Sequence, residues 1–254
     1  MFIDMSENQN QEESEETYGV VFYRYMPWDA FEKTLNSWSL KATIASQTND
    51  FFEFLPAKIK ESSANSYQRE IARDNKALLC FSKKMSNCAM WGHYADQYRG
   101  VCMAFYFPNS DLLKEVIYKK DRVVLNNDEN NITEEIMITK DESWKYEVEH
   151  RLIYDAEAAD MVSNGMLFYS EPMNYFIGVI LGPKCPYPVG YVKALIKLYQ
   201  KNKNINSKPN MDSPIVVTKG YPHETEFSIE SKFWNDKLNY DDLKGAGLLA
   251  KTLV

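Results

Sequence analysis

Short runs of β-branched and aromatic residues recur along the chain, and they decide which folds are open to it. The clearest are residues 18–26 (YGVVFYRYM), 77–83 (ALLCFSK), 100–107 (GVCMAFYF) and 174–183 (NYFIGVILGP). Residues of these types fit the pleated, half-buried surface of a sheet. About eight such strands and roughly three or four helices follow one another without strict alternation. This order predicts a mixed α+β domain rather than a doubly wound parallel sheet.

Two stretches show the features of amphipathic helices. Residues 27–40 (PWDAFEKTLNSWSL) begin with Pro and Asp, which suit a first helical turn, and place Phe31 four positions before Leu35. In residues 188–200 (PVGYVKALIKLYQ), apolar side chains recur on one helical face. The residues of that face are Val192, Leu195, Ile196 and Tyr199.

We expect a single α+β domain over residues 18–254. Residues 1–17 are mostly acidic and polar, which predicts a disordered tail. Residues 57–76 are polar and charged, and we expect them to form a surface insertion on a scaffold that does not need them. Residues 200–214 are predicted to form a solvated loop.

Composition limits the partners that we expect. The 254 residues are 44% hydrophobic, and their net charge of −7 argues against broad, nonspecific nucleic-acid binding. No apolar run has the length of a membrane span, and the N-terminus lacks a signal peptide's features. We therefore expect a cytoplasmic protein with no membrane partner and reduced thiols. The cysteines form no C-x-x-C pair, so we expect no metal site. They are Cys80, Cys88, Cys102 and Cys185.

Residues 144–151 (WKYEVEHR) carry the first candidate site. If they form a strand, Glu147, Glu149 and Arg151 project from one face. Carboxylates about 7 Å apart on such a face repel each other, and the arginine offsets that cost only partly. The pattern alone favours a solvated sheet face with an ion pair. The functional alternative is a pair of carboxylates that holds a hydroxyl-bearing or cationic substrate.

Residues 86–96 (SNCAMWGHYAD) carry the second candidate site. They are predicted to begin a helix capped by Ser86 or Asn87, with apolar side chains turned inward. This segment concentrates three ring-bearing side chains, Trp91, His93 and Tyr94. A further pair, Asn49-Asp50, is typical of a turn, and one of its two members is open to ligand binding. The chain contains no nucleophile elbow, phosphate-binding loop or dinucleotide fingerprint.

Four motifs, in order over residues 20–200, resemble those of the bacterial domain-of-unknown-function 2971 family. They are a tyrosine-rich first strand (Tyr23 to Tyr25), an Asn-Asp turn (Asn49-Asp50), a W-x-H-Y-A-D block leading to G-V-C (Trp91 to Cys102), and a W-x-x-E-x-E-W-R block (Trp144 to Arg151). The chain departs from the last motif at His150, where the family usually has tryptophan. Nothing after residue 200 matches a motif of the family.

The order of these parts is more distantly similar to ADP-ribosyltransferase folds, especially the DNA-targeting toxin type. That resemblance implies a mostly antiparallel, split central sheet, NAD as substrate, and a role as a toxin or phage-defence effector. A glutamate of such enzymes bonds the nicotinamide ribose and stabilises the oxocarbenium-like transition state, and here it would be Glu149 or Glu147. Aromatic groups would stack on nicotinamide, and an arginine would pair with phosphate. The implied cofactor-binding residues are Tyr23, Tyr25, Asn49, Trp91, His93, Tyr94 and Arg151, with Arg24 as an alternative arginine.

Two other functions fit the same residues. A metal-dependent nuclease would use Asp50, Glu147 and Glu149 as oxygen ligands for magnesium, although the strand lacks the lysine that follows E-x-E in one major nuclease class. A non-enzymatic sensor would use the aromatic cluster as a pocket for a peptide or small ligand. The sequence does not identify the macromolecule that would accept an ADP-ribosyl group.

Overall fold

The computed structural model describes residues 19–44, 47–55, 76–123, 132–202 and 215–248. Within them, eleven strands form one sheet, and two further strands, β6 and β7, pair with each other. The strands are β1 (Val20–Met26), β2 (Leu40–Ile44), β3 (Lys76–Ser82), β4 (Val101–Phe107), β5 (Lys114–Glu115), β6 (Ile117–Lys119), β7 (Thr139–Asp141), β8 (Glu149–Asp155), β9 (Met161–Ser163), β10 (Met166–Tyr169), β11 (Phe176–Leu181), β12 (Val216–Pro222) and β13 (Ile229–Ser231). The helices are α1 (Trp28–Ser37), α3 (Cys88–Tyr94), α4 (Ile132–Ile138), α5 (Val189–Asn202) and α6 (Tyr240–Gly245).

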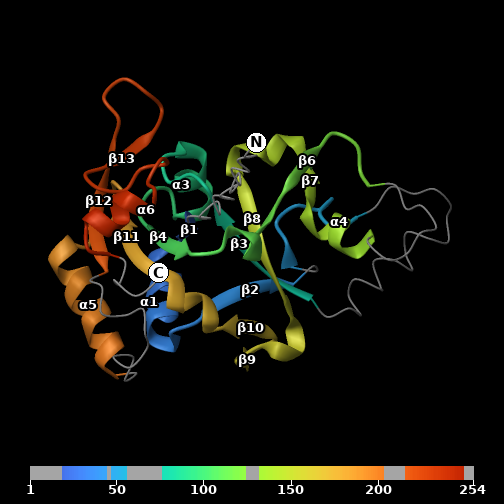
Figure 1. Cartoon of the computed structure of the whole chain (residues 1–254), viewed down its shortest axis with the longest axis horizontal. Coiled ribbons are helices and arrows are strands. Elements are labelled where there is room, and N and C mark those ends of the chain that lie inside the picture. The colour runs from blue at the N-terminus through green and yellow to red at the C-terminus, as the bar shows by residue number, and fades with distance from the viewer. Residues whose placement is uncertain (1–18, 45–46, 56–75, 124–131, 203–214, 249–254) are drawn as a thin grey trace, which may run out of the picture.

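The sheet is mixed but mostly antiparallel, and its path runs β13-β12-β11-β4-β1-β3-β2-β10-β9, with β8 against β3 and β5 (Figure 1). Of its pairings, only β11 with β12 is parallel. The α+β class is therefore confirmed. The four apolar runs at residues 18–26, 77–83, 100–107 and 174–183 form β1, β3, β4 and β11, whereas the short strands β5, β7, β9 and β10 were not expected.

Helices cover both faces of one half of the sheet (Figure 1). On one face, α1 and α5 bury Phe31, Leu35, Val192 and Ile196 in a core shared with Phe22. This confirms the expected apolar face of α5. On the opposite face, α3 and α6 pack over the side of β1 that carries Val21, Tyr23 and Tyr25. The alternation along β1 therefore points its tyrosines and its phenylalanine to opposite layers.

The two middle strands of the sheet, β1 and β3, separate almost at once. They share a single pair of facing residues, Tyr23 and Ser82. The first half of β3 pairs instead with β2, where Leu78 faces Thr43 and Ala77 faces Ile44. On its other edge β3 pairs with β8 along its whole length. The sheet is thus open between β1 and β3, and the candidate site lies at this opening.

Helix α3 forms as the sequence predicts. The side chain of Asn87 accepts hydrogen bonds from the backbone N–H groups of Ala89 and Met90, so Asn87 is the cap. After the helix, Asp96, Gln97 and Tyr98 all have positive φ angles and turn the chain into β4.

The expected strand over residues 144–151 is wrong in its first half. Residues Glu142–Glu147 form a 3-10 helix, η3, whose first turn is capped by the side chain of Asp141. Val148 then adopts a left-handed conformation, with φ 46° and ψ 52°, and β8 begins at Glu149. The side chain of Asp141 accepts from the N–H of Ser143, one of the free N–H groups of the first turn of η3, which helps a helical turn to compete with the strand.

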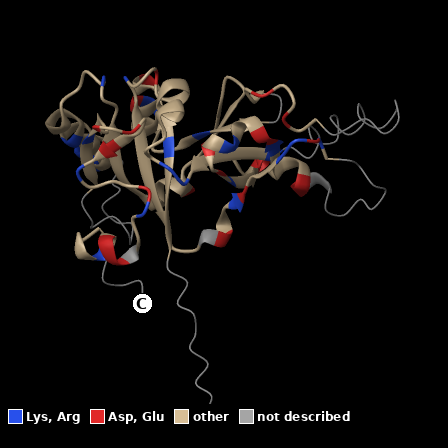
Figure 2. Ribbon diagram, turned by 90° about the horizontal axis from the view of Figure 1, so that it is seen from above, with Lys and Arg blue, Asp and Glu red and all other residues tan. Residues whose placement is uncertain are grey.

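Other sequence expectations fall mainly outside the described residues. The predicted tail (1–17), the insertion (57–76) and the loop (200–214) lie there, except that residues 200–202 end α5 and Lys76 begins β3. Among the described residues, no helix is long and apolar enough to cross a bilayer. Lys and Arg are interspersed with Asp and Glu along the ribbon (Figure 2).

Candidate active site

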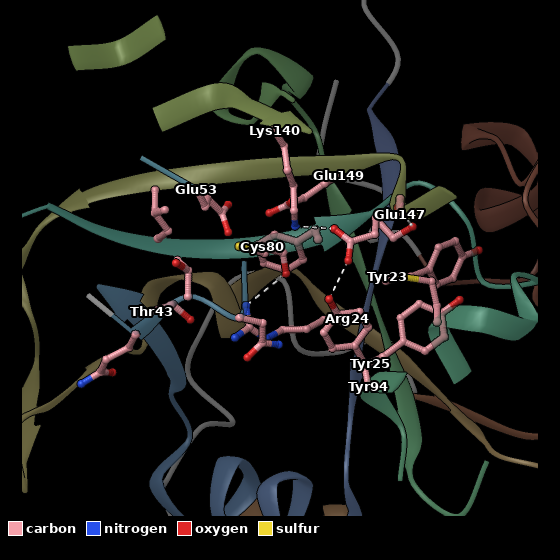
Figure 3. A pocket seen from close by; sticks show the side chains of 17 residues that line it. Tyr23, Arg24, Tyr25, Thr43, Glu53, Cys80, Tyr94, Lys140, Glu147 and Glu149 are labelled. Carbon is pink, nitrogen blue, oxygen red and sulfur yellow. Dashed lines mark hydrogen bonds and ion pairs between the residues drawn. The ribbon is translucent and has the colours of Figure 1, made fainter. Parts of the chain in front are cut away.

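A pocket of about 240 Å³ lies where the sheet opens between β1 and β3 (Figure 3). Its walls come from β1, β3, α3, the segment after β2, and the region around η3 and β8. Six of the predicted site residues line it: Tyr23, Tyr25, Asn49, Tyr94, Glu147 and Glu149. Residues that lie far apart in the sequence therefore meet in one cavity.

Of the carboxylates in the site, Glu149 accepts the most hydrogen bonds. Its Oε1 accepts from Nε of Arg151 at 2.8 Å, and its Oε2 accepts from Nη2 of Arg151 and Nζ of Lys140, both at 3.0 Å. Burial alone would raise its pKa, but the charge and hydrogen bonds of Arg151, followed by Lys140, outweigh that and lower the pKa to about 2. Glu149 is therefore an ionised, fully paired carboxylate.

Glu147 is also buried, with 3% of its surface exposed, but it has different partners. Its Oε1 accepts from the hydroxyl of Tyr94 at 2.6 Å, and its Oε2 accepts from Nζ of Lys140 at 2.6 Å. Burial raises the pKa of Glu147 above its ordinary value, and the opposing effects of Lys140 and Tyr94 do not reverse that direction. Two carboxylates in one pocket thus have pKa values displaced in opposite directions, a pattern typical of acid-base sites.

Lys140, on β7, is the residue that the sequence analysis missed. Its ammonium bridges Glu147 and Glu149 and lies 5.0 Å from the ring centroid of Trp144. Burial alone would lower its pKa, but Glu149, Glu53 and Glu147 together raise it. Lys140 therefore stays charged, and it holds the two carboxylates together.

The expected solvated face is also wrong. Arg151 is fully buried, and it donates to Glu53 and to the backbone carbonyl of Met137 at 2.5 Å in addition to Glu149. These residues form a buried ionic cluster of three carboxylates (Glu53, Glu147 and Glu149) and two cations (Lys140 and Arg151). With all three carboxylates ionised the cluster has one negative charge in excess, but burial raises the pKa of both Glu53 and Glu147 and so disfavours that state.

Tyrosines form the neighbouring wall. The hydroxyl of Tyr23 donates to the carbonyl of Asn235 at 2.8 Å, and that of Tyr25 donates to the carbonyl of Lys84 at 2.7 Å. Burial raises the pKa of both phenols. Since these hydroxyls are occupied by backbone carbonyls, Tyr94 is the member of the three whose hydroxyl faces a carboxylate.

Arg24 lies across the pocket from the carboxylates (Figure 3). Its two Nη atoms donate to the backbone carbonyls of Cys80, at 3.1 Å, and Lys41, at 2.8 Å. The guanidinium thereby ties β1 to both β2 and β3 across the opening. In the turn that follows β2, Asp50 accepts from the N–H of Phe52 at 2.9 Å, whereas Asn49 is exposed and lines the pocket.

Three of the predicted residues lie away from the pocket. Trp91 is fully buried under β1, where its Nε1 donates to the carbonyl of Met85 at 2.8 Å. His93 is exposed, and its Nδ1 lies 3.1 Å from the hydroxyl of Tyr146. Arg151 lies behind Glu149 as seen from the pocket and does not line it. An aromatic sensor pocket centred on Trp91 thus has no opening at that residue.

The arrangement leaves little room for a metal ion between the carboxylates. The ammonium of Lys140 already occupies the position between Glu147 and Glu149, and Asp50, whose Oδ1 accepts from Phe52 in the turn, does not line the pocket. Across the described residues, no three His, Cys, Asp or Glu side chains are grouped as metal ligands. The donor set therefore fits the nuclease alternative poorly.

We compared the chain with protein-family models, curated proteins and solved structures, and found no significant match.

Proposed function

We propose that this pocket binds the nicotinamide riboside half of NAD, and that the protein is an ADP-ribosyltransferase or an NAD glycohydrolase with an ADP-ribosyltransferase-like fold. The observation that supports this is the meeting of Glu147, Tyr94 and the β1 tyrosines in one pocket at the opening of the sheet. The order of motifs along the sequence points to the same class of enzyme.

The charge of the pocket suits the chemistry. As the bond between C1′ of the ribose and the nicotinamide nitrogen breaks, both electrons leave with neutral nicotinamide, and positive charge develops on the ribose. A water or an acceptor group then adds to C1′ and loses a proton. The carboxylate of Glu147, when ionised, favours that cationic transition state, because Lys140 and Tyr94 fix it in place before the reaction.

Between the two candidate carboxylates, Glu147 is the better reacting group. Glu149 already receives three hydrogen bonds from Arg151 and Lys140, so its lone pairs are committed. Glu147 receives one bond to each oxygen, and one of these comes from the hydroxyl of Tyr94, which a ribose hydroxyl can replace. We therefore assign Glu147 as the catalytic residue and Glu149 as a positioning residue that fixes Lys140.

The size of the pocket also fits half of a dinucleotide. Pockets that enclose whole drug-sized ligands have volumes of about 300–1,000 Å³. At about 240 Å³, this pocket holds a base and a sugar rather than all of NAD. Of the three tyrosines that line the pocket, Tyr94 is the one whose ring is partly exposed and can supply flat apolar surface for the base.

Nicotinamide release tests the proposal. Purified protein would be incubated with NAD, with and without a mixture of nucleic acid and protein, and free nicotinamide measured by chromatography. Glu147→Gln should lower the rate by about 10²-fold or more, because it removes a charge that acts in the transition state. Glu142→Gln is the matched control, since Glu142 is exposed at the start of the same 3-10 helix. A folded protein that neither binds nor consumes NAD would contradict the proposal.

A further inference from the structure

Neither Arg24, which lines the first pocket, nor Arg151, which lies behind it, is free to hold a phosphate. Arg151 is fully buried in the ionic cluster, and both Nη atoms of Arg24 donate to backbone carbonyls. A dinucleotide carries a diphosphate, and a protein usually meets such a group with unpaired cations or backbone N–H groups. Cations for the phosphates have to come from outside this pocket.

A second pocket, of about 220 Å³, lies directly beside the first. It is bounded by the segment after β2, by α4 and β7, and by the residues from the end of β6 onward. Lys140 lines both pockets. The segment after β2 forms a shared wall, because Glu53 lines the first pocket whereas Phe52 and Phe54 line the second.

The mouth of the second pocket is basic and aromatic. Lys120 and Arg122 are exposed there, and neither makes an ion pair with any residue that the structure describes. The guanidinium of Arg122 lies 5.9 Å from the ring centroid of Phe52, which is 57% exposed. In contrast, the nearby Lys119 is paired with Glu135 at 2.7 Å.

The interior of the second pocket is apolar. Phe54, Val123 and Ile136 line it, and all three belong to a small buried cluster. The carboxylates of Asp121 and Asp141 are also on the lining, where they can accept hydrogen bonds from sugar hydroxyls. An apolar interior, an exposed ring and two cations without an ion-pair partner among the described residues together match a nucleoside phosphate: its base packs inside and its phosphate stays at the mouth.

We propose that the second pocket binds a nucleoside phosphate, namely the adenylate half of the dinucleotide whose nicotinamide half occupies the first pocket; this rests on the proposed function. The two pockets share Lys140 and the wall formed by the segment after β2, so they are neighbours, and the proposal requires one extended ligand to span both. Lys120 and Arg122 are phosphate-binding residues at the mouth, and Phe54, Val123 and Ile136 pack against the base inside.

The experiment uses adenosine monophosphate and NAD as separate probes of the full chain. Affinities would be measured by calorimetry, and KM and kcat by nicotinamide release. The double variant Lys120→Gln, Arg122→Gln should weaken binding of adenosine monophosphate roughly tenfold and raise KM for NAD with little change in kcat. The control is Lys193→Gln, Lys197→Gln, which removes the same charge from the exposed side of α5.

The outcomes separate the two proposals. If NAD is consumed but the Lys120, Arg122 double variant keeps the parent's affinity for adenosine monophosphate and its KM, the second pocket is not a nucleotide site and the proposed function stands. If adenosine monophosphate binds and is lost in that variant while NAD is neither bound nor consumed, the pocket binds a nucleoside phosphate from another source and its link to NAD is wrong. Nicotinamide mononucleotide is the third probe, and its affinity should not respond to the double variant.

Discussion

Replacing Glu149 by glutamine tests the assignment of the two carboxylates most directly. The substitution keeps the shape of the side chain but removes its charge. Arg151, which is fully buried, then keeps Glu53 as its single carboxylate partner. Breaking one side of a buried ion pair in this way costs about 3–5 kcal/mol of folding stability, because a charge is left without compensation away from water.

The lowered pKa of Glu149 gives a second route to the same magnitude. Its carboxyl has a pKa of about 2 in the folded protein, against an ordinary value of 4.5. At about 1.4 kcal/mol per pH unit, the folded state gains about 3 kcal/mol from this group. Because the folded pKa is the lower one, that stability is fully present above pH 4.5 and is lost as the pH falls toward 2.

Thermal and denaturant unfolding measure both effects. For a chain of this size, a loss of about 3–5 kcal/mol lowers Tm by roughly 10 °C. The Glu149→Gln variant should therefore have a Tm roughly 10 °C lower at pH 7. It should also lose less further stability than the parent as the pH falls from 4.5 toward 2, because the carboxyl that titrates in that range is gone. Glu147→Gln is the isosteric comparison, and it should lose less stability, because the raised pKa of Glu147 means that folding disfavours its charged form.

Two results would refute this reasoning. One is a Tm for Glu149→Gln within about 2 °C of the parent at pH 7, which would mean that Arg151 finds another partner at no cost. The other is a larger loss for Glu147→Gln than for Glu149→Gln, which would exchange the structural and catalytic roles.

Three further predictions concern single contacts. Tyr94→Phe removes the 2.6 Å hydrogen bond to Glu147, so the pKa of that carboxyl should rise further and the pH profile of nicotinamide release should move to higher pH. Gly178→Ala should lower the free energy of unfolding by about 1–3 kcal/mol or more in chemical denaturation, because the new Cβ would lie 1.9 Å from Cζ2 of the fully buried Trp234. Gly190→Ala, in α5, meets no atom within 4 Å and should stabilise by up to about 1 kcal/mol in the same assay.

The sequence predicts the central strands well because their signal is local. Runs such as those of β4 and β11 are apolar throughout, and burial on both faces of the sheet requires that pattern. The short strands β5, β9 and β10 carry two to four residues each, and neighbouring strands rather than their own composition define them. No window of the sequence that short distinguishes a strand from a loop.

The site is less predictable because its charges are buried by distant segments. An E-x-E-x-R pattern is ordinary on a solvated strand, and nothing within residues 144–151 shows that Glu53 and Lys140 will cover it. Lys140 lies in MITKDESW, where a lysine between a helix and an acidic turn predicts only solvent exposure. Nothing in the sequence around Lys140 therefore identifies it as the bridge between Glu147 and Glu149.

Val148 explains how two glutamates two residues apart reach the same ammonium. In a regular strand their side chains would lie about 7 Å apart and parallel to each other. The left-handed conformation of Val148 instead ends η3 and starts β8, so Glu147 and Glu149 approach Lys140 from two different elements. A β-branched residue in this conformation carries a cost of about 1–2 kcal/mol.

That cost makes Val148→Gly an unusual substitution. Glycine adopts a positive φ without strain, so the gain of about 1–2 kcal/mol offsets the loss of a half-buried side chain and the greater freedom of the unfolded chain. We expect the free energy of unfolding to stay within about 1 kcal/mol of the parent. Val179→Gly, in the regular strand β11, is the control and should lose far more, since Val179 is fully buried. A loss at Val148 as large as that at Val179 would show that its side chain, and not its backbone conformation, brings the two carboxylates together.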